Sequence, residues 1–442
     1  MGVAHVGLFP CRRVRFQNCA WIIALIATTA ALPATGRAGM FSTFSAGFRT
    51  TAMAGVGAAS ADDSAAVFFN PALLAGAGTN ELFMMGVATR ENLTIAGQAV
   101  AVDSMSGYAM GFRARLGHRI GMGALLHMPS GGLARAGIRS PGEPRLALYD
   151  MRHDVLQLAL GLGAQITSEI NAGLGVRITA GGGVTSPSSI YISNYDDPEQ
   201  DDPDFRYSEV AVSAQFDPEW ALTAGVSWQP TPQWRAGMTF RDELYMPLDS
   251  SILIDVEIGG LIRVSVPLRV TGTLYYEPRE WALAARYEPE SRWLLAVELR
   301  RIEWSGYRDP RAEIEIGETD VNIPLFREYP PADFHDIWSP AVAGRYAIHR
   351  QADLYAGYAF VPAAAAAQTG DANLMDNAKH VIATGIEAMI ELPPSLGLPP
   401  LILGAAGQFQ HFIERENTKS DSQTFTAKGS LLHGGLSLRM EF

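Results

Sequence analysis

The sequence predicts an all-β fold, a transmembrane antiparallel β-barrel of about 14 strands with a segment held in its lumen. Three observations predict it: an export signal at the start, many stretches in which apolar residues alternate with small or polar ones, and a last strand that ends in phenylalanine. A count of strand-like stretches gives about 16, so a barrel of about 16 strands is the alternative.

The first 38 residues have the layout of a secretory signal peptide. A positively charged region, an apolar stretch and a small-residue site follow one another, namely Arg12, Arg13 and Arg15, then Ala20 to Leu32, then Gly36-Arg37-Ala38. We therefore expect cleavage after Ala38. A retained membrane anchor is the alternative, but Pro33 and the small-residue site argue against it.

Both cysteines of the chain, Cys11 and Cys19, lie in this leader, so the mature protein is expected to have no disulfide. The formal net charge is −12, and the leader carries four arginines and no acidic residue. Cleavage makes the protein still more acidic. Nucleic acid is therefore not expected as a partner.

Strict alternation recurs along the chain and indicates strands with one apolar face. It is clearest in the ranges 108–116, 120–128, 156–163, 170–178, 220–228 and 234–240. The stretches are long enough to cross a hydrocarbon layer, and their second face is rich in glycine and arginine, which suits a lumen. Aromatic residues at strand ends predict interfacial girdles: Trp220, Trp228, Trp234, Tyr275, Tyr276, Trp281, Trp293 and Trp304.

The connections between the stretches alternate in length, as they do in outer-membrane barrels. Short ones lie at 116–119, 167–169, 230–233 and 349–351, and long ones at 129–151, 181–207, 306–337 and 362–378. The chain ends on a strand whose apolar face is Leu436, Leu438, Met440 and Phe442. It resembles the terminal strand that the barrel insertion machinery reads. We expect a monomer in outer-membrane lipid, in a Gram-negative type of envelope.

Residues 39–80 alternate poorly and combine small residues with aromatic ones, so we expect a compact insert and not wall. The domain organisation predicted is a signal peptide at 1–38, an N-terminal hatch at 39–80 and the barrel at 81–442. Phe41 and Phe44 are candidates for lining a ligand pocket. The alternative is that these aromatic side chains only pack against the wall.

The run from Gly55 to Ala72, which ends in Phe68, Phe69, Asn70, Pro71 and Ala72, resembles the hatch motif of the FadL family of outer-membrane transporters. Weaker matches to the same family follow in order at 128–132, 302–307, 358–362 and 375–380. Residues 281–287 look like extra material relative to the family, which leaves the strand register between 250 and 300 open.

The resemblance implies a hatch that plugs the lumen and a hydrophobic ligand, such as a long-chain fatty acid or an aromatic hydrocarbon, that leaves through the wall. Pro129, Gly131 and Gly132 are the candidates for a strand kink that opens the wall laterally, because proline has no N–H to donate and glycine adds no bulk. An ordinary transition from strand to loop is the alternative at these three residues.

Motifs that carry chemistry are missing from the sequence, which lacks Gly-x-Ser-x-Gly, Cys-x-x-Cys and His-Glu-x-x-His. We expect no catalytic residue, metal or cofactor, and we interpret the acidic run at 196–204 as a solvated loop and not a cation site. The function expected is passive uptake of hydrophobic small molecules. A barrel enzyme acting on lipid and a general porin are the alternatives.

Overall fold

The structure is a computed structural model. It describes residues 44–76, 78–99, 106–130, 145–146, 156–180, 182–190, 208–258, 262–307, 313–316, 333–367, 374–418 and 424–442. The leader, Phe41, Gly131, Gly132 and the acidic run 196–204 lie outside these ranges. Within them, no helix is both long and apolar enough to cross a membrane.

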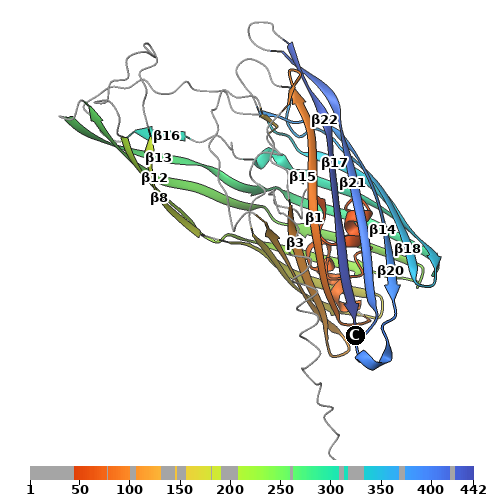
Figure 1. Cartoon of the computed structure of the whole chain (residues 1–442). Coiled ribbons are helices and arrows are strands. Elements are labelled where there is room, and N and C mark those ends of the chain that lie inside the picture. The colour runs from red at the N-terminus through yellow and green to blue at the C-terminus, as the bar shows by residue number, and fades with distance from the viewer. Residues whose placement is uncertain are drawn as a thin grey trace, which may run out of the picture.

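Fourteen of the described strands form one closed antiparallel barrel, shown in Figure 1. Around the wall they are β1 (Glu81–Ile95), β3 (Ser106–Leu116), β4 (Ile120–Pro129), β6 (Gln157–Gln165), β7 (Ile170–Thr179), β10 (Trp220–Trp228), β11 (Trp234–Arg241), β14 (Arg279–Glu290), β15 (Trp293–Glu303), β17 (Ile337–His349), β18 (Ala352–Val361), β20 (Lys379–Ile390), β21 (Leu401–Thr418) and β22 (Thr424–Glu441). The barrel closes where β22 pairs with β1. The prediction of about 14 strands is confirmed.

A second sheet extends four neighbouring wall strands beyond the barrel, at the upper left of Figure 1. Its strands are β8 (Gly182–Ile190), β9 (Ser208–Phe216), β12 (Leu244–Ile258), β13 (Ile262–Glu277) and β16 (Glu313–Ile316). β8 follows β7 and β12 follows β11, whereas β9 and β13 lead into β10 and β14. This extension explains the two extra strand-like stretches in the sequence. Three two-residue strands, β2 (Gln98–Ala99), β5 (Arg145–Leu146) and β19 (Leu374–Met375), complete the described set.

Two sequence-based expectations are corrected here. Residues 281–287 are not extra material, because they lie in β14, which pairs with β11 on one side and β15 on the other. The long connection expected at 181–207 is shorter, because β8 occupies 182–190.

The alternation in the sequence separates an outward apolar face from an inward face of small and polar residues. On β7, Leu174 exposes 68% of its surface outward, and its neighbours Gly173 and Gly175 face the interior. Five tryptophans expected in girdles are exposed, namely Trp220, Trp228, Trp234, Trp281 and Trp293. The assignment was wrong for Tyr275, Tyr276 and Trp304, which are buried inside the barrel.

Residues 44–76, here called the lumen segment, run through the interior of the barrel as short helices (Figure 1). α3 (Phe48–Ala52) packs against β18, β20 and β21, whereas η2 (Pro71–Gly76) packs against β4, β6, β7 and β10. α4 (Ala66–Phe69) lies between them and contacts β4, β6 and β7. Nearly every residue of the lumen segment is buried. The barrel is therefore filled across its width by its own chain.

Glycines on the inward face allow the backbone of the lumen segment to approach the wall. A β-carbon on Gly173 would lie 2.3 Å from the carbonyl carbon of Pro71, and one on Gly237 would lie 2.0 Å from the carbonyl oxygen of Ala58. Such distances are far shorter than van der Waals contact, so any larger residue would force the two backbones apart. The lumen segment therefore packs against the glycine-rich face that the sequence predicts for the lumen.

The C-terminus lies beside the first wall strand. Backbone N–H and C=O groups of Phe442 and Asn80 are hydrogen-bonded in both directions at 3.0 Å. Leu436 and Phe442 are exposed on the outside by 69% and 60%. The last strand therefore contributes its apolar face to the outer surface while it closes the barrel.

We predict that Gly173→Ala unseats η2, because the added methyl group meets backbone atoms that cannot rotate away. Overpacking of this kind typically costs about 1–3 kcal/mol. The measurement is the temperature at which the purified barrel loses its fast mobility on a gel. Gly407→Ala is the matched control, because a β-carbon there meets its nearest atom at 3.5 Å. If Gly173→Ala and Gly407→Ala lose the fast mobility at the same temperature, Gly173 is not needed to seat η2.

Candidate functional site

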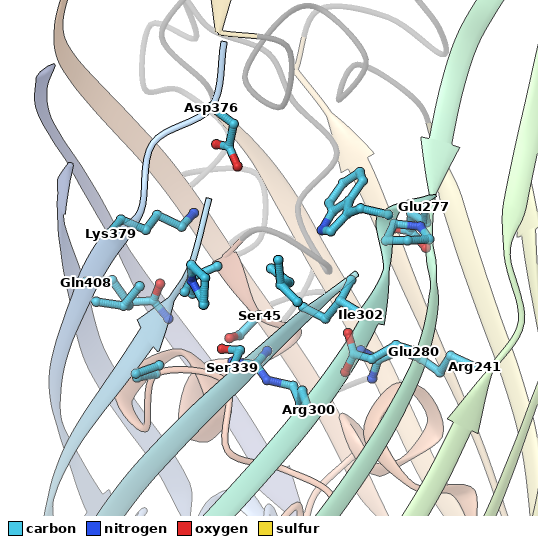
Figure 2. A pocket seen from close by; sticks show the side chains of 18 of the residues that line it. Ser45, Arg241, Glu277, Glu280, Arg300, Ile302, Ser339, Asp376, Lys379 and Gln408 are labelled. Carbon is cyan, nitrogen blue, oxygen red and sulfur yellow. The ribbon is translucent and has the colours of Figure 1, made fainter. Parts of the chain in front are cut away.

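A cavity of about 110 Å³ lies between the lumen segment and the strand ends that carry the long connections (Figure 2). Long connections face outward in barrels of this type, so we call it the outer cavity. The lumen segment contributes Ser45, Ala54 and Phe69 to its floor. Its sides come from the outer ends of wall strands, including Ile302 of β15 and Val361 of β18.

One side of the outer cavity is aromatic. Tyr276 and Trp304 line it, with ring centroids 6.2 Å apart, and Tyr307 and Phe334 pack behind them. The rings of Tyr307 and Phe334 meet edge to face at 4.6 Å. Aromatic surface of this kind favours an apolar or aromatic solute over a hydrated one.

Charged side chains also line the outer cavity, and several are paired. Arg241 forms an ion pair with Glu280, with Nη2 2.6 Å from Oε1, and Arg177 forms a close ion pair with Glu277. The Arg241 guanidinium also lies over the ring of Phe68, 4.5 Å from its centroid. A cation above the face of a ring is attracted by the ring quadrupole, so this contact ties Phe68 to β11.

The predicted hatch motif is wholly buried and touches the wall. Asn70 Nδ2 donates to the carbonyl oxygens of Ala58 at 2.7 Å and Val226 at 3.1 Å, and its Oδ1 accepts the N–H of Ala72 at 3.1 Å. A single side chain thus joins two parts of the lumen segment to β10. Phe69 lines the outer cavity, Phe68 packs edge to face on it, and Pro71 sits against Gly173.

Polar side chains of the wall hold the backbone of the lumen segment at three further points. Glu298 Oε2 accepts the N–H groups of Gly57 and Ala58, both at 2.9 Å. Glu81 Oε1 accepts the N–H of Ser64 at 2.8 Å, and Gln408 Nε2 donates to the carbonyl of Thr51 at 2.8 Å. Hydrogen bonds to a charged group are stronger than neutral ones, so the two glutamates are strong anchors.

Ion pairs add a second set of contacts. Arg49 pairs with Glu387 at 3.1 Å, and Asp62 pairs with Arg235 at 2.7 Å and more closely with Arg286. Burial raises the pKa of Asp62, but the guanidinium groups of Arg286 and Arg235 more than offset it, so the net pKa lies well below its usual range. Asp62 is therefore a carboxylate at neutral pH.

A second cavity, of about 420 Å³, lies on the opposite side of the lumen segment. It is lined by Gly78, Gln229 and Glu441 near the short turns, and by Arg49, Asp62 and Leu73 of the segment. We call it the periplasmic cavity, after the side that short turns face. The lumen segment thus lies between two cavities that open toward opposite ends of the barrel.

The other predicted site residues lie as follows. Phe44 is buried, and its ring stacks on His433 at 4.6 Å. Phe44 does not line the outer cavity, whereas Phe69 does. Pro129 ends β4 and pairs with Gly107 of β3. The described pairing of β4 with β6 reaches His127, opposite Gln157, the first residue of β6. Phe41, Gly131 and Gly132 are outside the described residues.

The sequence does not predict which charged side chains hold the lumen segment. Strand alternation places Glu298 and Glu387 on the inward face, but nothing in the pattern says which groups of the lumen segment they meet.

In the described part of the chain no group of three or more His, Cys, Asp and Glu side chains is arranged to hold a metal ion. The acidic run at 196–204 is not described, so its interpretation stays a prediction.

Replacing Asn70 and Pro71 by alanine should loosen the lumen segment, because the carbonyl oxygens of Ala58 and Val226 lose their donor. Leaving buried polar groups unsatisfied costs about 1–3 kcal/mol each. We expect larger or more frequent ion leak in single-channel recordings. Gln351→Ala, in an exposed turn, is the control. Unchanged conductance in the Asn70/Pro71 variant would show that this block does not anchor the segment.

Seating of the lumen segment should also depend on pH through Asp63. Burial and the neighbouring Glu81 raise the pKa of Asp63 to about 6, although Arg49, Arg439 and Arg113 act in the opposite direction. A carboxyl group whose pKa is raised in the seated state favours that state at low pH, so the stability falls as pH rises from about 4 to about 6 and is then constant.

We therefore expect less ion leak at pH 4 than at pH 7, with a difference in seating energy of about 1–3 kcal/mol. Asp63→Asn should remove this part of the pH dependence. Conductance recorded over that range in both proteins measures the difference. If the wild-type protein and Asp63→Asn follow the same pH curve, the assignment to Asp63 is wrong.

Comparisons with known proteins show the family to which the chain belongs. Residues 154–391, more than half of it, match the family described as outer membrane protein transport protein (OMPP1/FadL/TodX). No curated protein sequence matches it. A FadL homologue of Pseudomonas aeruginosa is similar in structure, with a TM-score of 0.58, 16% identity, and 90% of this chain and 97% of that chain covered.

Two further solved structures are similar. The P. putida toluene transporter TodX has a TM-score of 0.57 at 15% identity, with 90% of this chain and 98% of that chain covered. The Ralstonia pickettii toluene transporter TbuX has a TM-score of 0.54 at 14% identity, with 91% and 100% covered. These likenesses show a common fold. With the family match, they identify the chain as a member of the FadL/TodX family of outer-membrane transport proteins.

Proposed function

We propose that this protein carries hydrophobic small molecules passively across the outer membrane, with the outer cavity as their binding site. The observation that carries the proposal is the position of that cavity, between an aromatic side and the buried lumen segment. A hydrophobic solute gains free energy by leaving water for such a cavity and gains none in a water-filled pore. The resemblance to the FadL family implies long-chain fatty acids, and two of the similar structures are toluene transporters. Long-chain fatty acids and aromatic hydrocarbons are therefore the substrates to test.

The lumen segment is proposed to be a hatch. Its fit against inward glycines and its hydrogen bonds to Glu298 and Glu81 support this role, because they leave it filling the barrel between two cavities. The same fit argues against a general porin, which needs an open aqueous lumen. The domain organisation proposed remains a leader at 1–38, a hatch at 39–80 and a barrel at 81–442.

An enzyme acting on lipid is the other alternative. Such an enzyme needs a nucleophile beside a base. The described residues that line the outer cavity include the serines Ser45 and Ser339, but no histidine. The hydroxyl of Ser339 donates to the carbonyl of Phe360 at 2.9 Å. These observations favour transport without catalysis.

The remaining parts of the proposal concern the path and the assembly. We propose that the ligand leaves through the wall near Pro129, Gly131 and Gly132, because Pro129 at the end of β4 has no N–H to donate to a neighbouring strand. Phe41 and Phe44 stay candidates for contact with the ligand along this path. A monomer in outer-membrane lipid, inserted by machinery that reads the strand ending in Phe442 after cleavage of the leader, completes the proposal.

Uptake by whole cells tests the function. Cells that make the protein should accumulate radiolabelled oleate or toluene faster than cells that lack it, and sucrose at the same rate. Trp304→Ala should lower hydrophobic uptake several-fold, because it removes one of the aromatic rings that line the cavity. The loss of binding free energy should be about 1–3 kcal/mol. Trp338→Ala, with a side chain 55% exposed on the outer surface, is the matched control. Faster sucrose entry, or no gain for either hydrophobic compound, would contradict the proposal.

A further inference from the structure

The outer ends of the wall strands carry different side chains on different sides of the barrel. Exposed tryptophans lie at the outer ends of β10, β14 and β17, namely Trp220, Trp281 and Trp338. Among the described strands, the four neighbours β20, β21, β22 and β1 (Figure 1) contain no tryptophan. Basic and imidazole side chains take its place on their outward face, so this side of the barrel meets the membrane interface with different chemistry.

The apolar band of these four strands ends at one row of paired residues. On β22 the outward residues from Met440 to Leu432 are apolar or glycine, and those from Ser430 to Thr424 are polar. The apolar part is about as long as the 9–11 residues that a tilted strand needs to cross the hydrocarbon layer. The first polar row joins residues in register on all four strands, namely Asn92, Ser430, His411 and His380. We therefore expect lipid head groups at the level of this row.

Arg90 lies at the edge of the apolar band without a counter-charge among the described residues. It is exposed on the outward face of β1, directly opposite Leu432, and no hydrogen bond or ion pair joins it to another described residue. An arginine on a lipid-facing surface costs free energy unless it reaches the interface, and its guanidinium has five N–H donors in a fork that matches phosphate. A phosphate at the interface supplies the partner that the described part of the protein lacks.

Three further side chains on the same outward face can donate hydrogen bonds. Lys428 of β22 is exposed and pairs with Glu414 at 3.1 Å. Exposed ion pairs of this kind contribute little, so a phosphate can replace the carboxylate. His411 and His380 lie opposite each other on β21 and β20. Because Nδ1 of His380 lies 2.9 Å from the hydroxyl oxygen of Tyr358, its Nε2 is the ring nitrogen left for another partner.

The basic groups extend across several strands. Neighbouring strands lie about 4.8 Å apart, and Arg90 and His380 are three strands apart, so the surface is about 14 Å wide. That width suits a head group with two separated phosphates better than one with a single phosphate. The exposed acids of β21, Glu414 and Glu416, follow His411 toward the outer end of the strand and away from the apolar band.

We propose that Arg90, Lys428, His411 and His380 bind the head group of a lipid of the outer leaflet that carries two phosphates. Its acyl chains lie on the exposed apolar row next to the site, Leu432, Phe409 and Ile382. Charge-assisted hydrogen bonds to phosphate are stronger than those between neutral groups, so the bound lipid is held more tightly than its neighbours in the membrane. None of the four residues lines the outer cavity, so this lipid is a fixed partner and not the transported ligand.

Native mass spectrometry of the purified full-length mature protein in detergent micelles tests the site. The probes are diphosphoryl and monophosphoryl lipid A, which have the same acyl chains and differ by one phosphate. We expect the wild-type protein to bind the diphosphoryl form about tenfold more tightly, as hydrogen bonds to charged groups allow. Arg90→Gln should lower the affinity for this form about tenfold and reduce the preference, whereas Arg90→Lys should keep most of both.

Arg301→Gln is the matched control and should bind like the wild-type protein. Arg301 also lies near the outer end of a wall strand with an exposed side chain, but it pairs with Asp336 and lies over the ring of Trp338. If Arg90→Gln fails to fold, Lys428→Gln together with His411→Gln tests the same surface and should lower the affinity several-fold. Equal affinity of the wild-type protein for the two lipids, no binding of either, or equal effects of Arg90→Gln and Arg301→Gln would overturn the site.

Discussion

The close approach between the lumen segment and the wall is the constraint on which the rest of the structure depends. Backbone atoms of Pro71 and Ala58 lie where the β-carbons of Gly173 and Gly237 would otherwise be. Sliding or rotation of the segment would therefore bring its backbone into steric conflict with the wall. Among the described residues, a cavity lies on each side of the segment.

The same constraint explains why charges are found inside. A backbone buried against a wall needs hydrogen-bond partners, and glycine supplies none from a side chain. Glu298, Glu81 and Gln408 provide them between the glycines. Once Glu298 is committed to the N–H groups of Gly57 and Ala58, Arg300 is left with a distant counter-charge and faces the outer cavity. The polar character of the floor is thus a consequence of how the lumen segment is held.

Much of the fold could be predicted from the sequence, because alternation has a period of two that matches the faces of a strand. The ranges 108–116 and 170–178, the outward face of Leu174 and the closing strand before Phe442 were all placed correctly. The extension formed by β12 and β13 could not be told apart from wall strands, since a strand that leaves the barrel alternates just as one that stays. Trp304 was assigned to a girdle because its burial depends on the aromatic partners Tyr276 and Phe334, which are distant in sequence. The contacts that hold the lumen segment join residues distant in sequence, which the local pattern of a strand does not predict.

Engineered cysteines test most directly whether the lumen segment sits in the wall as described. A β-carbon on Gly111 would lie 2.9 Å from Cβ of Ser64, somewhat closer than the roughly 3.8 Å of a disulfide. Residues 44–442 contain no cysteine to interfere. In an oxidising envelope, Ser64→Cys with Gly111→Cys should give the joined peptide in high yield by mass spectrometry. Ser64→Cys with Phe112→Cys, on the opposite face of β3, should give none. An unlinked 64/111 pair, or equal linkage of both pairs, would contradict a hatch seated on the inward glycines.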